Sequence, residues 1–489
     1  MGLSIENSSD YHGTDKLIVG IVLAVVTFWL FAQTTLNIAP AIRSDLGITE
    51  SLSNIAVSIT ALFSGIFIVV AGGLADRFGR LKLTYIGLAL SIVGSFLIAV
   101  SPSGTAVFLI VGRIIQGLSA ACIMPATLAL IKAYYDGSAR QRALSFWSIG
   151  SWGGSGLCSL FGGFVASSFG WRWIFWTSIL VAVLSFVLLK GTPDSSVPSM
   201  GSDRFDWAGF IAFLIAMVSL NILIGQGAQL GWTSPATLGL AVVFAAAALW
   251  FFRIEIGNSL AFVDLKLFGN KTYTGATLSN FLLNGAAGTL LVALTLVQQQ
   301  AGLSSLESGL LTAGYLIAIL STIRVGEKLL QRWGARKPML LGCSITAVGI
   351  FLTSFTFLLA RQYLVAAFVG FTLFGIGLGF YATPSTDAAL SNVPDEKAGA
   401  ASGIYKMASS LGAAFGVAIS AAVFTLLSNS TLDLASISDL FIGRTDNINV
   451  RFAAAVALAL NVLMVIAAIA AIAATIPKQA DKSGQKGHQ

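Results

Sequence analysis

Long apolar stretches alternate with short polar segments along almost the whole chain. A helix of about 20 apolar residues crosses a bilayer, whereas a barrel strand needs only about 9–11. The stretches here have about 20 residues or more, so the pattern favours helices. It predicts an all-α membrane protein with fourteen spanning helices, at 17–38, 52–74, 83–101, 105–132, 143–168, 172–190, 206–226, 235–253, 274–299, 307–330, 338–359, 363–386, 398–427 and 451–476.

The composition supports the lipid bilayer as the surrounding solvent. Of 489 residues, 56% are hydrophobic and only 10% are charged, and the mean hydropathy is +0.85. A soluble domain needs a more polar exterior than this. The first 15 residues contain no basic leader or small-residue cleavage site, so we expect no signal peptide to be removed. The cysteines Cys122, Cys158 and Cys343 lie in apolar stretches and indicate no disulfide framework.

The distribution of basic residues predicts the orientation of the chain. With both termini in the cytoplasm, twenty Lys and Arg fall inside, five fall outside and three lie within spans. This is a strong positive-inside bias. The net charge of +7 is therefore a topology signal and no evidence for nucleic acid as a partner. We expect a multi-pass protein of the plasma membrane.

The loop between the second and third spans contains the most specific pattern. It runs from Gly72 through Asp76, Arg77, Gly79 and Arg80 to Lys82 between two apolar stretches. We expect Asp76 to begin the third helix, where the helix dipole favours a carboxylate. Together with Arg77 and Arg80 it would hold the cytoplasmic ends of helices together in the outward-facing state. The alternative is a solvated loop that only sets topology.

An internal repeat predicts two related halves. The stretch 326–337 ends in Gly334-Ala335-Arg336-Lys337, a degenerate echo of the first loop, in which Gln331 replaces Asp76. We expect six-helix bundles at 1–190 and 274–489, joined at 191–273 by two additional spanning helices. Related halves that meet at the bilayer midplane are the usual basis of alternating access.

Four features resemble the major facilitator superfamily, and its fourteen-helix drug:proton antiporters in particular. They are the 72–82 loop, the Arg113-x-x-Gln116-Gly117 motif, a glycine-rich fifth span and the number of spans. In the fifth span, the residues that match or replace the antiporter motif are Gly154, Cys158, Ser159, Gly162 and Gly163.

Further strings are similar to the NorB/NorC type of quinolone efflux pump, among them Ser148–Gly156, Tyr381–Asp387 and Gly403–Ser410. This resemblance implies proton-driven export of quinolones, cationic dyes, biocides and other amphipathic compounds by a monomer, with no bound cofactor. Two departures limit it. Cys158-Ser159 stands where the antiporter motif has Gly-Pro, and no acidic residue lies in the first span.

Charged residues inside spans are candidates for proton coupling or gating. Arg113 near the membrane middle costs about 2.5–3.5 kcal/mol on insertion scales. We interpret it as a permanent charge that tunes a proton site; the alternative is hydrogen bonding to backbone carbonyls. Asp387 is the best acidic candidate for proton uptake, with Lys406 within reach across the 388–398 loop. The alternative is that Asp387 belongs to the cytoplasmic loop and caps a helix end. Arg324 and Glu327, three residues apart, fit either a gating pair or an interfacial salt bridge.

Substrate contacts are predicted from aromatic and amide side chains on the inner helices, since amphipathic drugs need aromatic walls with few polar partners. Any of these side chains could instead face lipid or neighbouring helices. The residues concerned are Phe28, Trp29, Phe31, Gln33, Gln116, Asn280, Asn284, Gln298, Tyr315 and Tyr381.

The sequence also disfavours several functions. It contains no nucleotide-binding Gly-x-x-x-x-Gly-Lys-Ser/Thr loop, which indicates a secondary transporter and no enzyme. Its two histidines, His12 and His488, lie in the termini and suggest no metal site. The nearest rival is an importer or facilitator of a small polar metabolite. A receptor or scaffold fits poorly, because the longest polar segment is only residues 428–450.

Overall fold

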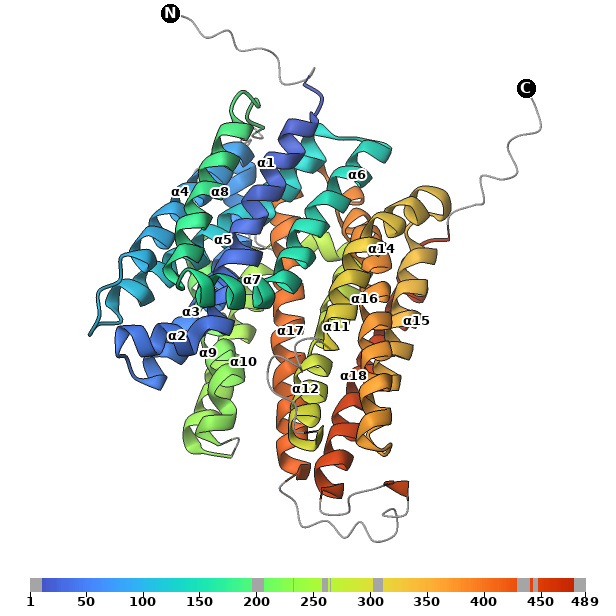
Figure 1. Cartoon of the computed structure of the whole chain (residues 1–489). Coiled ribbons are helices and arrows are strands. Elements are labelled where there is room, and N and C mark those ends of the chain that lie inside the picture. The colour runs from blue at the N-terminus through green and yellow to red at the C-terminus, as the bar shows by residue number, and fades with distance from the viewer. Residues whose placement is uncertain are drawn as a thin grey trace, which may run out of the picture. The chain divides into compact units, whose positions relative to one another are not determined.

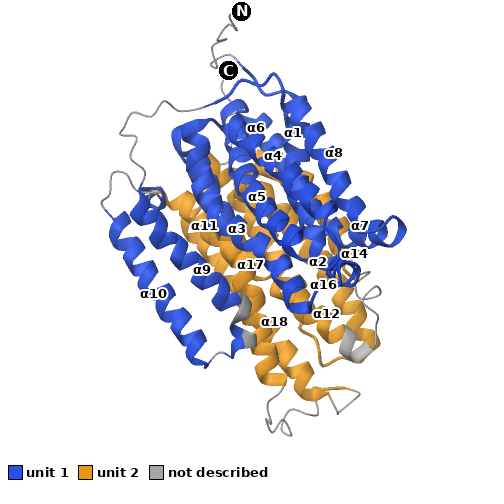
Figure 2. Cartoon of the chain, turned by 90° about the vertical axis from the view of Figure 1, so that its left-hand side faces the viewer, with its two compact units in different colours: residues 1–269, 393–407 blue, residues 270–392, 408–489 orange. Residues whose placement is uncertain are grey.

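A computed structural model describes residues 11–195, 206–231, 233–256, 263, 265–301, 311–428, 440–442 and 447–478. Its regular elements are helices, and the described residues include no strand (Figure 1). The chain divides into two compact units, which Figure 2 shows in different colours. Unit 1 contains residues 1–269 and 393–407, and unit 2 contains residues 270–392 and 408–489.

Unit 1 begins with a continuous helical rod that changes winding in the middle: α1 (Asp15–Val26), the π-helical η1 (Thr27–Ala32) and α2 (Gln33–Leu46). A second such rod is α6 (Gly137–Ser148), the π-helical η2 (Ile149–Gly153) and α7 (Gly154–Ser168). The remaining long helices of unit 1 are α3 (Glu50–Phe78), α4 (Arg80–Ala99), α5 (Val107–Tyr134), α8 (Arg172–Leu189), α9 (Trp207–Leu230) and α10 (Pro235–Glu255).

Unit 2 contains α11 (Lys271–Gly285), α12 (Gly288–Ala301), α14 (Ala313–Trp333), α15 (Arg336–Thr353), α16 (Ala360–Ser391) and α18 (Ile448–Thr475). Helix α17 (Ala398–Ser428) is divided in sequence: its residues up to Met407 group with unit 1 and the following ones with unit 2. Two short 3-10 turns, η3 (Leu265–Gly269) and η4 (Asp395–Lys397), belong to unit 1.

Helix boundaries follow signals that are local in the sequence. Thr14 and Thr49 are N-caps whose hydroxyls accept hydrogen bonds from Leu17 N and Leu52 N. Gly47 ends the first rod with a left-handed φ of 63°, a conformation that glycine adopts without strain. The first span is longer than predicted, since the helix continues through Pro40 to Leu46.

Eleven described helical segments are long and apolar enough to cross a membrane. They correspond to eleven of the predicted spans. The stretch predicted at 143–168 is also helical, in α6–η2–α7, and the described part of 307–330 contains α14 from Ala313 onward. The stretch predicted at 338–359 is helical only as far as Thr353, where α15 ends, so this predicted span is too long at its C-terminal end. The chain is therefore an all-helical, multi-pass membrane protein.

The internal repeat is visible as a repeated packing scheme. In unit 1 the contacting pairs include α3 with α5, α4 with α5, α4 with α8, and α1 with α8. In unit 2 the corresponding pairs are α14 with α16, α15 with α16, α15 with α18, and α11 with α18. The same order of helices thus produces the same neighbours in each unit.

Glycines at equivalent crossings explain how these helices pack so closely. A Cβ on Gly94 would lie 2.9 Å from Gly112 O, across the α4–α5 crossing. At the equivalent α15–α16 crossing, a Cβ on Gly349 would lie 2.6 Å from Gly370 O. Larger side chains would force each pair apart, because small residues are what allow backbones in membranes to approach.

Candidate functional site

A charge cluster, buried except for the exposed side chain of Asp395, lies where the 72–82 loop meets the start of α17. We define the Asp76 cluster as Asp76, Arg80, Lys132 and Asp395 together with the backbone N–H groups of Gly399 and Ala400. All six belong to unit 1. Asp76 and Arg80 are buried, although each carries a charge in its ordinary ionised form.

Asp76 is the centre of this cluster. Its Oδ1 accepts hydrogen bonds from Arg80 Nε at 3.1 Å and Nη2 at 2.9 Å, and from Gly399 N at 2.9 Å. Its Oδ2 accepts one from Ala400 N at 3.0 Å. The carboxylate therefore occupies the positive end of α17, where helix N–H groups lack partners within the helix.

This geometry corrects two predictions. Asp76 lies in the last turn of α3 and does not begin the following helix, which starts at Arg80. The dipole that it meets is that of α17, far away in sequence. Arg77 is exposed and takes no part in the cluster, whereas Arg80 is central to it.

Close backbone contact brings the helices of the cluster together. A Cβ on Gly72 would lie 2.3 Å from Gly399 O, and a Cβ on Gly399 would lie 2.3 Å from Gly72 O. Neither position tolerates a side chain without a shift of the backbone. Gly72 of the predicted loop motif is therefore required by the α3–α17 contact.

Lys132 and Asp395 were missed by the sequence analysis. Lys132 is buried at the end of α5, forms an ion pair of 3.3 Å with Asp395 Oδ1 and donates to Val393 O. Arg80 also donates to Asp395 O. In the sequence Lys132 was one of many basic residues at span ends, and nothing local distinguished it from a solvated one.

Arg113 has a second, separate set of partners. Its guanidinium donates to Ala56 O at 2.9 Å, Ala32 O at 2.7 Å and Gln116 Oε1 at 2.9 Å, and more weakly to Val57 O at 3.4 Å. The contacts to carbonyl groups are those of the alternative interpretation, in which Arg113 hydrogen-bonds to the backbone of neighbouring helices. No carboxylate of the described residues pairs with this side chain, so its positive charge is solvated by dipoles alone.

Gln116, predicted as a substrate contact, instead forms hydrogen bonds within the Arg113 network. Its Oε1 accepts from Arg113, and its Nε2 donates to Ser95 Oγ at 3.2 Å. The side chain is buried. It orients the guanidinium within unit 1.

Lys406 lies buried in the first half of α17, on the face of an indole ring. Its Nζ is 4.3 Å from the centre of the Trp147 ring. Trp147 is itself buried and donates from Nε1 to Thr127 Oγ1 at 3.0 Å. Cation–π contact partly replaces the hydration of an ammonium group. Lys406 has no ion pair within the described part of the chain.

The acidic candidates lie in unit 2. Asp387 is buried in α16, one turn before the helix ends at Ser391, so it is no loop residue. It belongs to unit 2, whereas Lys406 belongs to unit 1. In α14, Arg324 and Glu327 form the ion pair that their spacing predicts, with Glu327 buried and also accepting from Gln331 Nε2 at 3.2 Å.

The glycine-rich fifth span packs against the first. A Cβ on Gly154 would lie 3.1 Å from Trp29 Cβ, and a Cβ on Gly162 would lie 2.3 Å from Thr34 Cγ2. Thr34 Oγ1 also donates to Cys158 O at 3.0 Å. Ser159 and Gly163 are exposed and outside this contact.

Both rods contain a π-helical segment at this contact, η1 in the first and η2 in the fifth, and the two segments touch. Single π-helical turns inside helices are frequent at functional sites.

The predicted substrate residues separate into two groups. In unit 1, Phe31 is buried against Phe161, whereas Trp29 and Gln33 are only partly buried. In unit 2, Tyr381 bonds to Ser279 Oγ at 2.7 Å, Asn284 donates to Asn280 Oδ1 at 2.9 Å, and Tyr315 packs beside Phe374. Gln298 has no described side chain.

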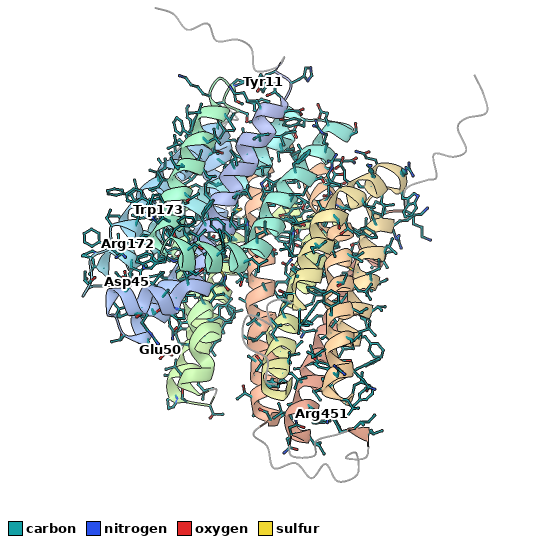
Figure 3. The ribbon with its side chains drawn as sticks, in the orientation of Figure 1. Tyr11, Asp45, Glu50, Arg172, Trp173 and Arg451 are labelled. Carbon is teal, nitrogen blue, oxygen red and sulfur yellow. The ribbon has the colours of Figure 1, made fainter. Side chains whose placement is uncertain are left out.

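At the Glu50 end of α3, unit 1 carries an aromatic cluster with one ion pair. Arg172 pairs with Asp45 and stacks 4.4 Å from the Trp171 ring, and Trp171 Nε1 donates to Asp45 Oδ2 at 3.1 Å. Figure 3 labels Asp45, Arg172 and Trp173 near one another. The cavity beside them measures about 330 Å³ and is lined by Asp45, Phe169, Gly170, Trp171, Arg172, Trp173 and Trp176.

A repeated bundle of spanning helices with buried charges between them is the architecture of a multi-pass membrane transporter. The sequence model of the Major Facilitator Superfamily matches residues 21–417 and 276–488. The chain belongs to this superfamily, and it is a transporter and no enzyme.

Curated relatives match along nearly the whole chain. The quinolone resistance protein NorB of Staphylococcus aureus strain COL is 51% identical over 471 residues, which covers 96% of this chain and 98% of the relative. The protein of the same name from strain Newman is also 51% identical over 471 residues, with the same coverage.

Solved structures with low identity share the fold. The proton:xylose symporter XylE bound to 6-bromo-6-deoxy-D-glucose superposes with a TM-score of 0.64 at 16% identity, covering 95% of this chain and 96% of XylE. The human organic anion transporter MFSD10 gives a TM-score of 0.58 at 14% identity, covering 92% and 98%.

Proposed function

We propose that this chain exports quinolones and other amphipathic drugs, including cationic dyes and biocides, across the plasma membrane in exchange for protons. The observation that carries the proposal is the 51% identity, over 96% of the chain, to a protein named for quinolone resistance. The buried charges of both units support a mechanism in which transport is coupled to ion movement, because charges inside a membrane are expensive and mark ion or substrate pathways.

The proposed topology has fourteen spans, arranged as six-helix bundles at 1–190 and 274–489 with two linker helices between them. Both termini are cytoplasmic in this scheme, which places the 72–82 loop on the cytoplasmic side. The positive-inside distribution of Lys and Arg supports it.

The Asp76 cluster is proposed to act as a latch that stabilises the outward-facing state at its cytoplasmic end. Its carboxylate holds Arg80 and the first N–H groups of α17 together. Breaking a buried ion pair costs about 3–5 kcal/mol, so the latch gives one conformation a large but reversible advantage.

Proton coupling is assigned to Asp387 and Lys406, with Arg113 as a fixed charge. Asp387 is a buried acid on a helix of unit 2, and Lys406 is a buried amine on an indole face in unit 1. A protonated Lys406 and a cationic drug repel each other in a medium of low dielectric constant. Binding of proton and drug would then exclude one another, which is the requirement for antiport.

Substrate recognition is proposed for the partly buried aromatic and amide groups, Trp29, Gln33 and Tyr315, which retain accessible surface. Phe31, Gln116 and Tyr381 are buried within their units and are assigned a supporting role. Asn280 and Asn284 complete a polar pair on α11.

The proposal is tested with purified protein in liposomes that carry an imposed pH gradient. We expect accumulation of norfloxacin or ethidium driven by the gradient, and proton movement that depends on the drug. An uncoupler should abolish both. A protein that equilibrates a polar metabolite and moves no protons in response to drug would instead be the rival facilitator.

Replacing Asp387 by asparagine is expected to remove the response to the pH gradient and to leave expression intact. An amide cannot carry the proton, and it keeps the size of the side chain. Drug efflux rates with and without the gradient measure the effect. The control is Asp15→Asn, which changes an exposed carboxylate paired with Arg142 and should leave gradient-driven efflux at the native rate. Gradient-driven efflux at the native rate in Asp387→Asn would exclude Asp387 from coupling.

A further inference from the structure

The first turn of α4 obtains its hydrogen-bond acceptors from a distant part of the chain. The first N–H groups of any helix lack partners within that helix. Here Leu81 N donates to Asp194 Oδ1 at 2.9 Å, and Lys82 N donates to Asp194 Oδ2 at 3.3 Å. Arg80 N donates to Ser195 O at 3.2 Å. Two consecutive residues that follow α8 thus cap the first three N–H groups of α4.

Gly79 leaves the room that this arrangement needs. It is the N-cap residue of α4, with a φ of 117°, and it provides no side-chain cap of its own. A Cβ at this position would lie 2.1 Å from Asp194 Oδ2. The glycine of the loop motif therefore admits the carboxylate of Asp194 as well as an unusual backbone angle.

Two further contacts hold residues 193–195, which form the capping segment, in place. Tyr134, at the end of α5, donates from its hydroxyl to Pro193 O at 2.6 Å. Lys82 Nζ lies 4.0 Å from Asp194 Oδ2, and the Asp194 side chain is only 21% exposed. The carboxylate is thus largely withdrawn from water and oriented from two sides.

The same turn of α4 carries Arg80, whose guanidinium reaches Asp76 and Asp395 O. The backbone N–H of Arg80 donates to Ser195 O, and those of Leu81 and Lys82 donate to Asp194, while the side chain of Arg80 holds the Asp76 cluster. The equivalent helix start in unit 2 makes a different contact: the side chain of Arg336, at the start of α15, donates to Ile476 O and Ala473 O, and so satisfies carbonyl groups at the end of α18.

We propose that Asp194 is a positioning residue of the transport cycle, which places Arg80 for its contact with Asp76. The segment 193–195 leads into the linker helices α9 and α10, so displacement of this segment would remove three acceptors from α4 together and loosen the Asp76 cluster. The proposal rests on the latch role of that cluster.

Hydrogen exchange of the full-length protein in detergent tests the inference directly. In Asp194→Ala, amides 80–82 are expected to exchange about five- to tenfold faster, as for loss of a helix cap. Amides 399–400 are expected to exchange faster as well, because Arg80 is no longer held in place. Asp194→Asn keeps one acceptor and is expected to lie between the two. Transport should show a lower maximal rate with an unchanged KM for drug.

Asp136→Ala is the matched control. Asp136 is an exposed N-cap residue of α6 whose side chain makes no capping bond. Its replacement should therefore leave the exchange rates of amides 80–82 and 399–400 unchanged. If Asp194→Ala speeds exchange at 80–82 and leaves 399–400 and transport unchanged, Asp194 is only a local cap and the inference is wrong. If Asp76→Ala also leaves transport unchanged, the latch itself has failed, which is a different result.

Discussion

Replacing Asp76 by alanine is expected to reduce drug efflux at least about a hundredfold. The substitution leaves Arg80 buried without its carboxylate and removes the acceptors of Gly399 N and Ala400 N. Removing one partner of a buried ion pair costs about 3–5 kcal/mol, and about 1.4 kcal/mol corresponds to a factor of ten. The state that the cluster stabilises would then be scarcely populated.

Initial efflux rates in liposomes, measured together with drug binding, report this loss. Asp15→Ala serves as the control, since Asp15 pairs with Arg142 on the surface, where the two side chains are 73% and 45% exposed. For Asp76 and Arg80 the values are 8% and 4%. Exposed pairs contribute about 0–1 kcal/mol, so Asp15→Ala should transport normally. Equal rates for the two variants would show that the loop only sets topology.

Replacing Arg113 by alanine is expected to abolish transport and to lower the stability of the protein by several kcal/mol. The carbonyls of Ala56 and Ala32 and the amide oxygen of Gln116 lose their donor. A buried acceptor without a partner costs about 1–3 kcal/mol. The melting temperature in detergent and the efflux rate in liposomes measure the two effects separately.

Arg113→Lys separates the charge of this residue from its geometry. Lysine keeps the positive charge, but its single ammonium group cannot reproduce the planar fork that serves three helical segments. If the charge tunes a proton site, Arg113→Lys should retain transport with a normal dependence on pH at a reduced melting temperature. Loss of transport equal to that of alanine, in a folded protein, would assign Arg113 to the scaffold alone.

The sequence alone determined which segments become apolar helices and that they form a repeat. It also identified the 72–82 loop and Arg113 as candidates for function. The reason is that these properties are local. A stretch of about 20 apolar residues needs the bilayer whatever its neighbours are, and a charge within it is costly wherever it points. The ion pair between Arg324 and Glu327 is equally local, since three residues separate its members on one helix face.

The partners of these charges were decided by tertiary structure. Asp76 caps a helix that begins more than 300 residues later, Lys132 pairs with Asp395, Asp194 caps α4, and Trp147 covers Lys406. Arg77 and Arg80 stand three residues apart in one motif, yet one is exposed and the other buried. Hydropathy indicates whether a segment is buried in the bilayer. The hydrogen-bond partners of a charged side chain, however, depend on which distant segments of the backbone pack against it. Packing of the helices settles that.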